Sequence, residues 1–249
     1  MNGTVYLVGA GPGAPDLLTL RAARLLERAG IVFHDALVNP EIVALAVRAE
    51  KIPVGKRCGR HSAAQKFINK RLVDAARKYD VVVRLKGGDP MLFGRAQEEI
   101  DALSKAGIRF EVVPGVTSAL AASADLGISL TRRGISRSVT FVTPRIGEGE
   151  EAGNWVRAAL AADTTAIYMG VGEAQSISAA LIAGGKPAST PVAIVEDAST
   201  PVSRWVTGEL RDLARLAETG LGGPALILIG EVYRQIVHFE STNHEQISA

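Results

Sequence analysis

Glycine-rich turns after short apolar runs are the residues of this chain best suited to hold a ligand. The first run, Val5–Val8, enters a turn with glycines at positions 9, 11 and 13. The spacing fits the G-x-G-x-x-A pattern of dinucleotide-binding loops, and Asp35 follows about 20 residues on, where such sites carry an acid for the ribose. However, Pro12 and Pro15 lack the N–H groups that a pyrophosphate needs, and the turn has no Lys or Arg. The loop therefore favours a ligand without phosphate, and a turn that only shapes the chain is the alternative.

Two further apolar runs end in turns of the same design. The residues that these turns offer to a ligand are Gly87, Gly88, Asp89, Thr117 and Ser118. Glycines at the carboxyl end of a strand let the backbone approach a ligand, and open α/β sheets bind ligands along that edge. Asp89 can accept hydrogen bonds from a ribose or an amine, whereas an ordinary Gly-Asp-Pro turn is the alternative. Three such turns predict one binding edge.

Composition excludes several classes of function. The net charge is only +2 and aromatic residues make up 5%, so we expect no nucleic-acid partner. No apolar run approaches the roughly 20 residues of a membrane span, and no basic segment precedes the first run, so we expect a cytoplasmic protein without a signal peptide. The single Cys58 suits a reducing compartment. The four histidines lack metal-ligand spacing, and we therefore expect no metal.

Short β-branched runs alternate with stretches of helical periodicity, which predicts an α/β fold. The predicted strands are Val5–Val8, Ile31–His34, Val81–Leu85, Phe110–Val113, Val139–Thr143, Ala166–Met169, Val192–Val195, Arg204–Thr207 and Leu226–Ile229. Helical patterns such as Leu17–Arg28 and Ala63–Arg77 predict a mainly parallel sheet before residue 130. The seventh and eighth runs are too close together for a parallel crossover, so they predict a mixed sheet. We expect two α/β domains, 1–130 and 131–240, and a polar tail, 241–249.

Several segments occur in an order that resembles a known family. They are "VGAGPGAPDLLTL", "HDALV", "VGKRCGRHS", "VVRLKGGDPMLFGR", "VVPGVTSALAA", "GISLTRRG", "YMGVG" and "PALILIGEV". The chain resembles the uroporphyrinogen-III C-methyltransferases of the tetrapyrrole (precorrin) methyltransferase family over roughly residues 3–236. The resemblance implies two α/β domains of the tetrapyrrole methylase type, with S-adenosylmethionine (SAM) and the active site in the cleft between them. It also implies a homodimer.

The same resemblance implies roles for individual residues. The implied SAM contacts are Pro12, Gly87, Gly88, Asp89, Leu92, Thr117, Ser118, Met169 and Ala198. Asp35 is the implied proton acceptor and Lys56 the implied proton donor, whereas a strand-end turn residue and a solvated lysine are the alternatives. The chain departs from the family pattern at Ala14, Ala96, Gln97, Arg145 and Ala198.

Basic residues indicate how a substrate would be recognised. Uroporphyrinogen III carries carboxylates, which call for guanidinium groups and other hydrogen-bond donors. The residues expected to bind them are Arg57, Arg60, His61, Arg132 and Arg133, and a solvated basic face is the alternative. The resemblance implies methylation at C2 and C7 to precorrin-2 through precorrin-1, in sirohaem or cobalamin biosynthesis. A methyltransferase of a later precorrin, a nicotinamide-dependent oxidoreductase and a non-catalytic SAM-binding regulator are the alternatives.

Overall fold

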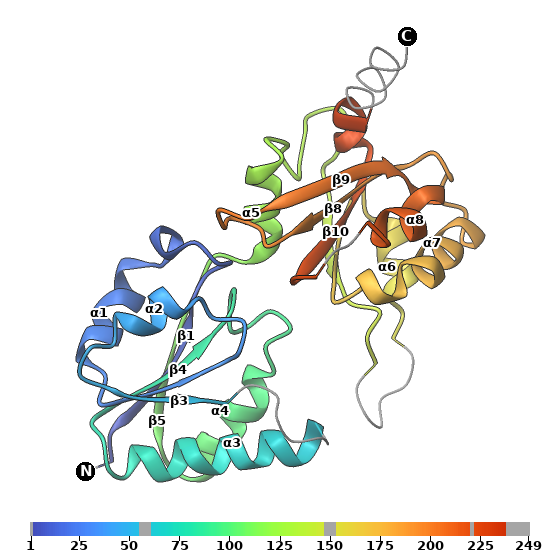
Figure 1. Cartoon of the computed structure of the whole chain (residues 1–249). Coiled ribbons are helices and arrows are strands. Elements are labelled where there is room, and N and C mark those ends of the chain that lie inside the picture. The colour runs from blue at the N-terminus through green and yellow to red at the C-terminus, as the bar shows by residue number, and fades with distance from the viewer. Residues whose placement is uncertain (1, 55–60, 147–152, 220–221, 238–249) are drawn as a thin grey trace. The chain divides into compact units, whose positions relative to one another are not determined.

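The computed structural model describes residues 2–54, 61–146, 153–219 and 222–237, with residues 61–64 described by their backbone alone. The chain forms two compact units, Met1–Ser118 and Ala119–Ala249, each built on a five-stranded sheet (Figure 1). Within the described ranges, no helix is both long enough and apolar enough to cross a membrane.

The first unit contains a wholly parallel sheet with the strand order β3-β2-β4-β1-β5. Its strands are β1 (Thr4–Gly9), β2 (Ile31–His34), β3 (Glu50–Pro53), β4 (Val81–Lys86) and β5 (Arg109–Val113). The prediction of a mainly parallel sheet is confirmed, but β3 was not predicted. Its sequence, "EKIP", is short and charged and ends in proline, and such a segment is tolerated at the edge of a sheet, where one row of N–H groups has no neighbour.

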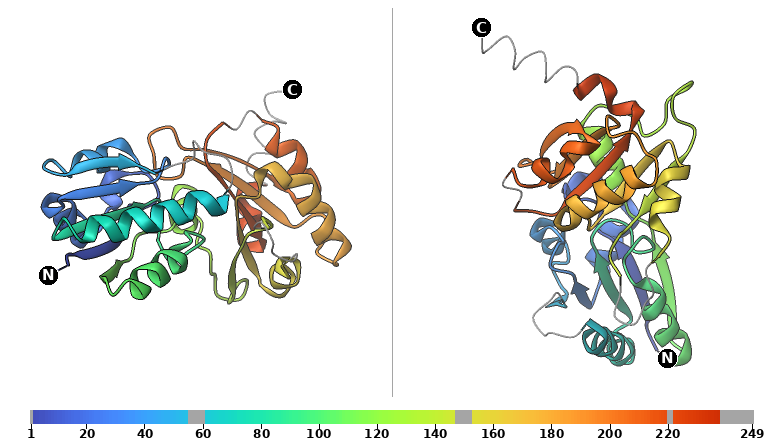
Figure 2. Two further views of the ribbon diagram at one scale, coloured as in Figure 1. Left: turned by 90° about the horizontal axis from the view of Figure 1, so that it is seen from below. Right: turned by 90° about the vertical axis from the view of Figure 1, so that its right-hand side faces the viewer.

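Helices cover both faces of this first sheet (Figures 1 and 2). Apolar residues of α1 (Leu20–Arg28) and α2 (Pro40–Ala44) pack against one face, and those of α3 (His61–Ala76) and α4 (Ala96–Lys105) against the other. The Thr19 side chain caps α1 by accepting a hydrogen bond from the Ala22 N–H at 3.2 Å. Because all five strands are parallel, their carboxyl ends lie at one edge of the sheet, where their following loops begin.

The second unit contains a mixed sheet with the order β6-β7-β10-β8-β9. Its strands are β6 (Val139–Val142), β7 (Thr164–Tyr168), β8 (Pro191–Glu196), β9 (Arg204–Glu209) and β10 (Ala225–Gly230). Strands β6 and β7 are parallel, and the other neighbours are antiparallel. The expected antiparallel pairing of β8 with β9 is therefore confirmed. Strand β10, the last of the five in the chain, occupies the centre of the sheet.

The two faces of the second sheet are covered by different helices (Figure 1). Residues of α6 (Trp155–Ala161), α7 (Ala174–Ala183) and α8 (Leu213–Ala217) pack on one face, and α5 (Ser118–Asp125) packs on the other. Three alanines of α5, at positions 119, 121 and 122, are buried against this sheet. This packing explains why the second compact unit begins at Ala119, one residue into α5. The domain boundary near residue 130 stays a prediction.

Candidate active site

The loops that follow β1 and β4 are joined through their backbones. The N–H of Gly11 donates to the carbonyl of Gly88 at 3.2 Å, and the N–H of Gly88 donates to the carbonyl of Gly11 at 2.7 Å. Strands β1, β4 and β5 are neighbours in the sheet, so the predicted turns after them begin side by side. The structure thus brings together the three glycine turns that sequence reasoning singled out.

Some glycines in these loops allow the backbones to pack closely, and others leave open space at a strand end. A Cβ on Gly9 would lie 2.6 Å from the Cα of Gly115 and 2.7 Å from the carbonyl oxygen of Gly88, so Gly9 and Gly115 are required for the loops to pack. A Cβ on Gly87 would instead meet only the Cβ of Leu37, at 3.8 Å. Gly87 and Gly88 therefore leave space at the strand end, as a closely approaching ligand requires.

Asp89 joins two loops through its carboxylate. Its Oδ1 accepts a hydrogen bond from the Met91 N–H at 2.8 Å, and its Oδ2 accepts one from the Gly115 N–H at 2.9 Å. The first bond closes an Asx turn, and the second ties the turn after β4 to the turn after β5. The alternative of a structural turn residue therefore has support in the geometry, and only the remaining lone pairs of Asp89 are open to a ligand.

The other residues expected to contact a cofactor in this unit are half-buried in the same loops or, for Ser118, at the start of α5. They are Pro12, Leu92, Thr117 and Ser118. The Asn39 side chain, which sequence reasoning did not identify, donates from Nδ2 to the carbonyl of Gly13 at 2.9 Å and so fixes the first loop. Phe93 and Arg95 adopt φ angles of 52° and 54° just beyond the second loop. Non-glycine residues in the left-handed region are concentrated at functional sites, because the strain persists only where the surroundings enforce it.

Asp35, the expected proton acceptor, follows β2 at the same edge and is part of a charged cluster. The Nη2 atom of Arg84 lies 2.5 Å from its Oδ1, and the Nζ atom of Lys86 lies 4.0 Å from its Oδ2. Arg84 also donates from Nε to Oε1 of Glu99 at 2.9 Å, and Lys86 lies 3.3 Å from the same oxygen. Sequence reasoning missed Arg84, Lys86 and Glu99, although two cations inside the apolar strand "VVVRLK" were a visible signal.

Burial and neighbouring charges change the pKa values of both cations. Burial lowers the pKa of Lys86, and the adjacent Arg84 guanidinium lowers it further. Burial also disfavours the charged form of Arg84, but the carboxylates of Glu99 and Asp35 outweigh this effect and raise the pKa of Arg84. Arg84 is thus a permanent cation between two carboxylates, whereas Lys86 loses its proton more readily than an ordinary lysine.

The expected substrate-binding residues are described only in part. Lys56, Arg57 and Arg60 lie outside the described residues, and His61 is described only as the first residue of α3. Arg132 and Arg133 are exposed in the second unit. The backbone of Arg132 closes a turn with Ser136, whose N–H donates to the Arg132 carbonyl at 2.8 Å.

The two expected cofactor contacts of the second unit differ in exposure. Met169 directly follows β7 with a φ of 56°, and 45% of its surface is exposed. The Ala198 side chain is instead buried in the core under the second sheet. Its neighbours Asp197 and Ser199 have φ angles of 49° and 72°, so the turn is strained on both sides of a packed methyl group. Ala198 could therefore offer a ligand only its backbone.

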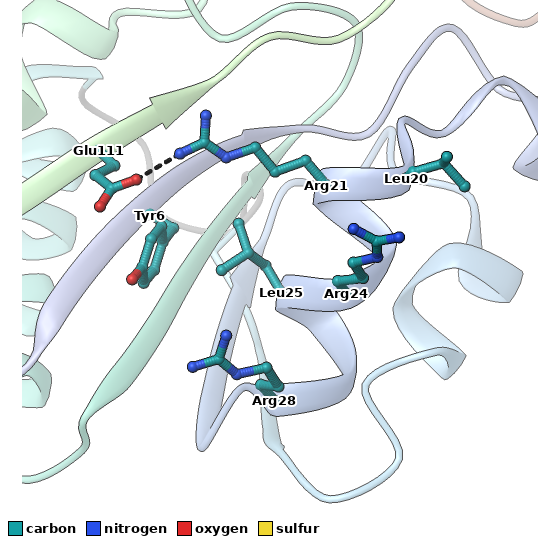
Figure 3. A pocket seen from close by; sticks show the side chains of 7 residues that line it. All are labelled: Tyr6, Leu20, Arg21, Arg24, Leu25, Arg28 and Glu111. Carbon is teal, nitrogen blue, oxygen red and sulfur yellow. Dashed lines mark hydrogen bonds and ion pairs between the residues drawn. The ribbon is translucent and has the colours of Figure 1, made fainter.

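A cavity of about 510 Å³ lies elsewhere in the first unit (Figure 3). It is lined by Tyr6, Leu20, Arg21, Arg24, Leu25, Arg28 and Glu111. An ion pair of 2.6 Å between Arg21 and Glu111 connects α1 with the edge strand β5. Because none of the loop residues described above lines this cavity, we do not assign it to the candidate site. Among the described residues, no group of three or more His, Cys, Asp or Glu side chains could hold a metal ion.

Comparison with known proteins gives curated relatives that are longer than this chain. A siroheme synthase of Chromobacterium violaceum is 50% identical over 232 residues, which make up 92% of this chain and 49% of that protein. A siroheme synthase of Pseudomonas putida is 48% identical over 233 residues, or 93% of this chain and 50% of that protein. The chain thus spans about half the length of the curated relatives it matches.

Solved structures match the chain over nearly their whole length. The native uroporphyrin III C-methyl transferase of Thermus thermophilus is 41% identical with a TM-score of 0.81, covering 93% of this chain and 94% of that one. The uroporphyrin-III C-methyl transferase of Thermus thermophilus complexed with S-adenyl homocysteine has the same identity and TM-score, covering 93% and 99%. A cobalt precorrin-4 methyltransferase is 29% identical with a TM-score of 0.82, covering 92% and 95%.

A family model gives the same result from sequence alone. The model for Tetrapyrrole (Corrin/Porphyrin) Methylases matches residues 4–214, which include both sheets up to β9. The parallel first sheet and the mixed second sheet agree with the solved tetrapyrrole methylase structures. This chain belongs to the family of Tetrapyrrole (Corrin/Porphyrin) Methylases.

Proposed function

We propose that this chain methylates uroporphyrinogen III at C2 and C7 with SAM as the methyl donor, giving precorrin-2 by way of precorrin-1. The observation that carries the proposal is the 41% identity over 93% of the chain with an enzyme described as a uroporphyrin III C-methyl transferase. The siroheme synthases among its relatives support a place in sirohaem synthesis, and we include cobalamin synthesis as an alternative use of the product.

The residues at the first sheet edge fit SAM. Gly87 and Gly88 leave space for close backbone approach, and the first loop contains Pro12 but no Lys or Arg, which suits a ligand without phosphate. The residues proposed to hold SAM are Pro12, Gly87, Gly88, Asp89, Leu92, Thr117, Ser118, Met169 and the backbone of Ala198. When bound, SAM supplies a methyl group on a positively charged sulfur, which an electron-rich pyrrole carbon can accept.

The chain's own residues would orient the substrate and transfer protons. Methyl transfer between two bound molecules depends mainly on proximity and orientation, which the packed loops supply. We assign the Asp35 carboxylate to the proton that the methylated pyrrole ring releases and Lys56 to proton donation. The residues proposed to bind substrate carboxylates are Arg57, Arg60, His61, Arg132 and Arg133.

We also propose that the chain acts in the cytoplasm as a homodimer on a small tetrapyrrole substrate. The single Cys58 suits a reducing compartment, and the family resemblance supports the homodimer. Sedimentation of the purified chain at several concentrations tests the assembly, and a monomer at every concentration would contradict it.

The decisive experiment is anaerobic incubation of the chain with uroporphyrinogen III and methyl-labelled SAM. We expect two labelled methyl groups in the product and none when uroporphyrinogen III is omitted. The second candidate is a methyltransferase of a later precorrin, which the match to a cobalt precorrin-4 methyltransferase favours. Methylation of a later precorrin without methylation of uroporphyrinogen III would replace the first proposal with the second.

A further inference from the structure

Charged side chains are buried on one face of β4, where the core of the first unit would otherwise be apolar. Arg84 and Lys86 lie at every second position after Val82, so the three share the face of β4 that α3 and α4 cover. Arg84 and Lys86 are 2% and 3% exposed. Glu99 of α4 is fully buried. Burial of ion pairs often contributes nothing net, and apolar replacements can be more stable. Stability alone therefore does not account for this cluster.

Glu99 anchors both cations. Its Oε1 accepts hydrogen bonds from Arg84 Nε at 2.9 Å and from Lys86 Nζ at 3.3 Å, and the buried Gln65 side chain donates to the same oxygen at 3.1 Å. A second guanidinium nitrogen of Arg84, Nη1, donates to the Leu85 carbonyl at 3.2 Å. These bonds hold the guanidinium plane in one orientation and direct Nη2 toward Asp35.

Asp35 is the member of this cluster that reaches the surface. Its side chain is 32% exposed at the carboxyl edge of the sheet, while Arg84 behind it is buried. The charged and titratable groups that face it are Arg84 and Lys86 from β4 and Glu99 from α4, and the His34 ring contacts its carbonyl oxygen at 3.3 Å. The two cations balance the two carboxylates, so the buried network is neutral when Asp35 is charged.

We propose that Arg84, anchored by Glu99, is a positioning residue that fixes the Asp35 carboxylate for the methyl-transfer reaction. This inference rests on the proposed function, because that function gives Asp35 its role. A carboxylate held by a rigid, buried guanidinium keeps one orientation, and small errors in orientation can reduce turnover about a hundredfold. Lys86 completes the charge balance and remains next to the second carboxylate oxygen of Asp35.

Three variants separate charge from geometry. Arg84→Met removes both, so we expect kcat to fall by about tenfold to a hundredfold and the acid limb of its pH profile to move to higher pH. Arg84→Lys keeps the charge but loses the fork, so kcat should fall while the acid limb stays near that of the wild type. Glu99→Gln removes a negative charge and loosens the anchor, so kcat should fall while the acid limb moves to lower pH. SAM affinity, measured by calorimetry, should change less than about twofold.

A matched core variant distinguishes positioning from general loss of stability. Leu72 is fully buried in the same core on α3, and Leu72→Ala should lower the melting temperature without moving the pH profile. The proposal is overturned if Arg84→Met and Arg84→Lys keep the wild-type kcat, or if Leu72→Ala moves the pH profile as far as Arg84→Met. If Arg84→Met does not fold, the other two variants still decide, because the acid limb should stay near that of the wild type in Arg84→Lys and move to lower pH in Glu99→Gln.

A measurement without substrate keeps this inference separate from the proposed function. The carboxyl carbon of Asp35 can be assigned by NMR from the signal that disappears in Asp35→Asn. We expect the chemical shift of that signal at neutral pH to change in Glu99→Gln and to stay at its wild-type value in Leu72→Ala. A wild-type chain that does not methylate uroporphyrinogen III would overturn the proposed function, whereas an unchanged chemical shift in Glu99→Gln would overturn the coupling of Asp35 to the buried cluster.

Discussion

Gly9 and Gly115 pack backbone against backbone, so that a Cβ on Gly9 would lie 2.6 Å from the Cα of Gly115. The first residue ends β1 and the second follows β5, and the two strands are neighbours. The contact therefore sets how closely two of the three proposed cofactor loops approach each other.

Gly9→Ala should destabilise the protein, because the added methyl group has no room between the loops. Overpacking of this kind costs about 1–3 kcal/mol, measured as the free energy of unfolding in a denaturant titration. Gly87→Ala is the matched control, since its Cβ would meet only Leu37 at 3.8 Å. We expect Gly87→Ala to keep its stability and lose SAM affinity. Equal stability of the two variants would contradict the packing role of Gly9.

Gly88→Ala tests close approach of the ligand separately from backbone strain. Gly88 and Gly107 have φ angles of +64° and +66°, so alanine at either position should cost about 1–2 kcal/mol of stability. Gly107 lies between α4 and β5, away from the three loops. We expect only Gly88→Ala to weaken SAM binding in calorimetry, and equal affinities would mean that the turn after β4 has no part in SAM binding.

SAM and S-adenosylhomocysteine should raise the melting temperature, whereas NAD and NADP should not. At about 100 times the dissociation constant, a ligand that binds only the folded state adds roughly 2.7 kcal/mol of stability. A thermal-shift titration with all four compounds is sufficient. A response to NAD without one to SAM would restore the dinucleotide interpretation of the first loop.

Arg57→Ala, Arg60→Ala and Arg133→Ala should each raise the KM for uroporphyrinogen III and leave SAM affinity nearly constant. A hydrogen bond to a charged group is worth about 1.5–3 kcal/mol, and about 1.4 kcal/mol is a factor of ten, so the increase should be roughly tenfold to a hundredfold. Arg77→Ala is the control. Arg77 directly follows α3, is exposed, and forms an ion pair of 3.7 Å with Asp74 in that helix. A normal KM in all three variants would mean that the basic residues are a solvated face.

Asp163 should make the stability of the protein depend on pH. The N–H of Arg137 and both the hydroxyl and N–H of Ser138 donate to its carboxylate, and these bonds lower the pKa of Asp163 below its ordinary value of 3.8. Because the folded-state pKa is the lower one, the stabilisation is complete above the unfolded value and is lost as the pH falls through the folded value.

The test is to measure the free energy of unfolding from neutral pH to pH 3 for the wild type and Asp163→Asn. We expect the wild type to be more stable at neutral pH and the difference to shrink below about pH 4. A difference that stays constant across this range would show that the charge of Asp163 has no effect.

Much of the fold follows from local sequence patterns. Runs rich in β-branched and apolar residues made β1, β2, β4 and β5 predictable, and the short link between β8 and β9 indicated their antiparallel pairing. The edge strand β3 could not, because a charged, proline-ended segment has no such pattern. The central place of β10 also could not be predicted, since strand order depends on contacts between distant segments.

The site was predictable where glycines mark strand ends and less so where side chains meet. The three turns lie next to each other as expected, but the division between packing glycines and open glycines depends on distances. The cluster of Arg84, Glu99 and Asp35 joins a strand, a helix and a loop that are far apart in the chain, and no local spacing shows it. The burial of the Ala198 methyl group similarly depends on the second sheet.

The position of β10 has a consequence for synthesis on the ribosome. Every strand of the first unit precedes Ser118, so that unit can complete its sheet while later residues are still being translated. In the second unit, β7 and β8 each pair with β10, which ends at Gly230. Until that strand emerges from the exit tunnel, β7 and β8 each lack a partner on one edge, and the sheet of the second unit remains two separate pairs, β6 with β7 and β8 with β9.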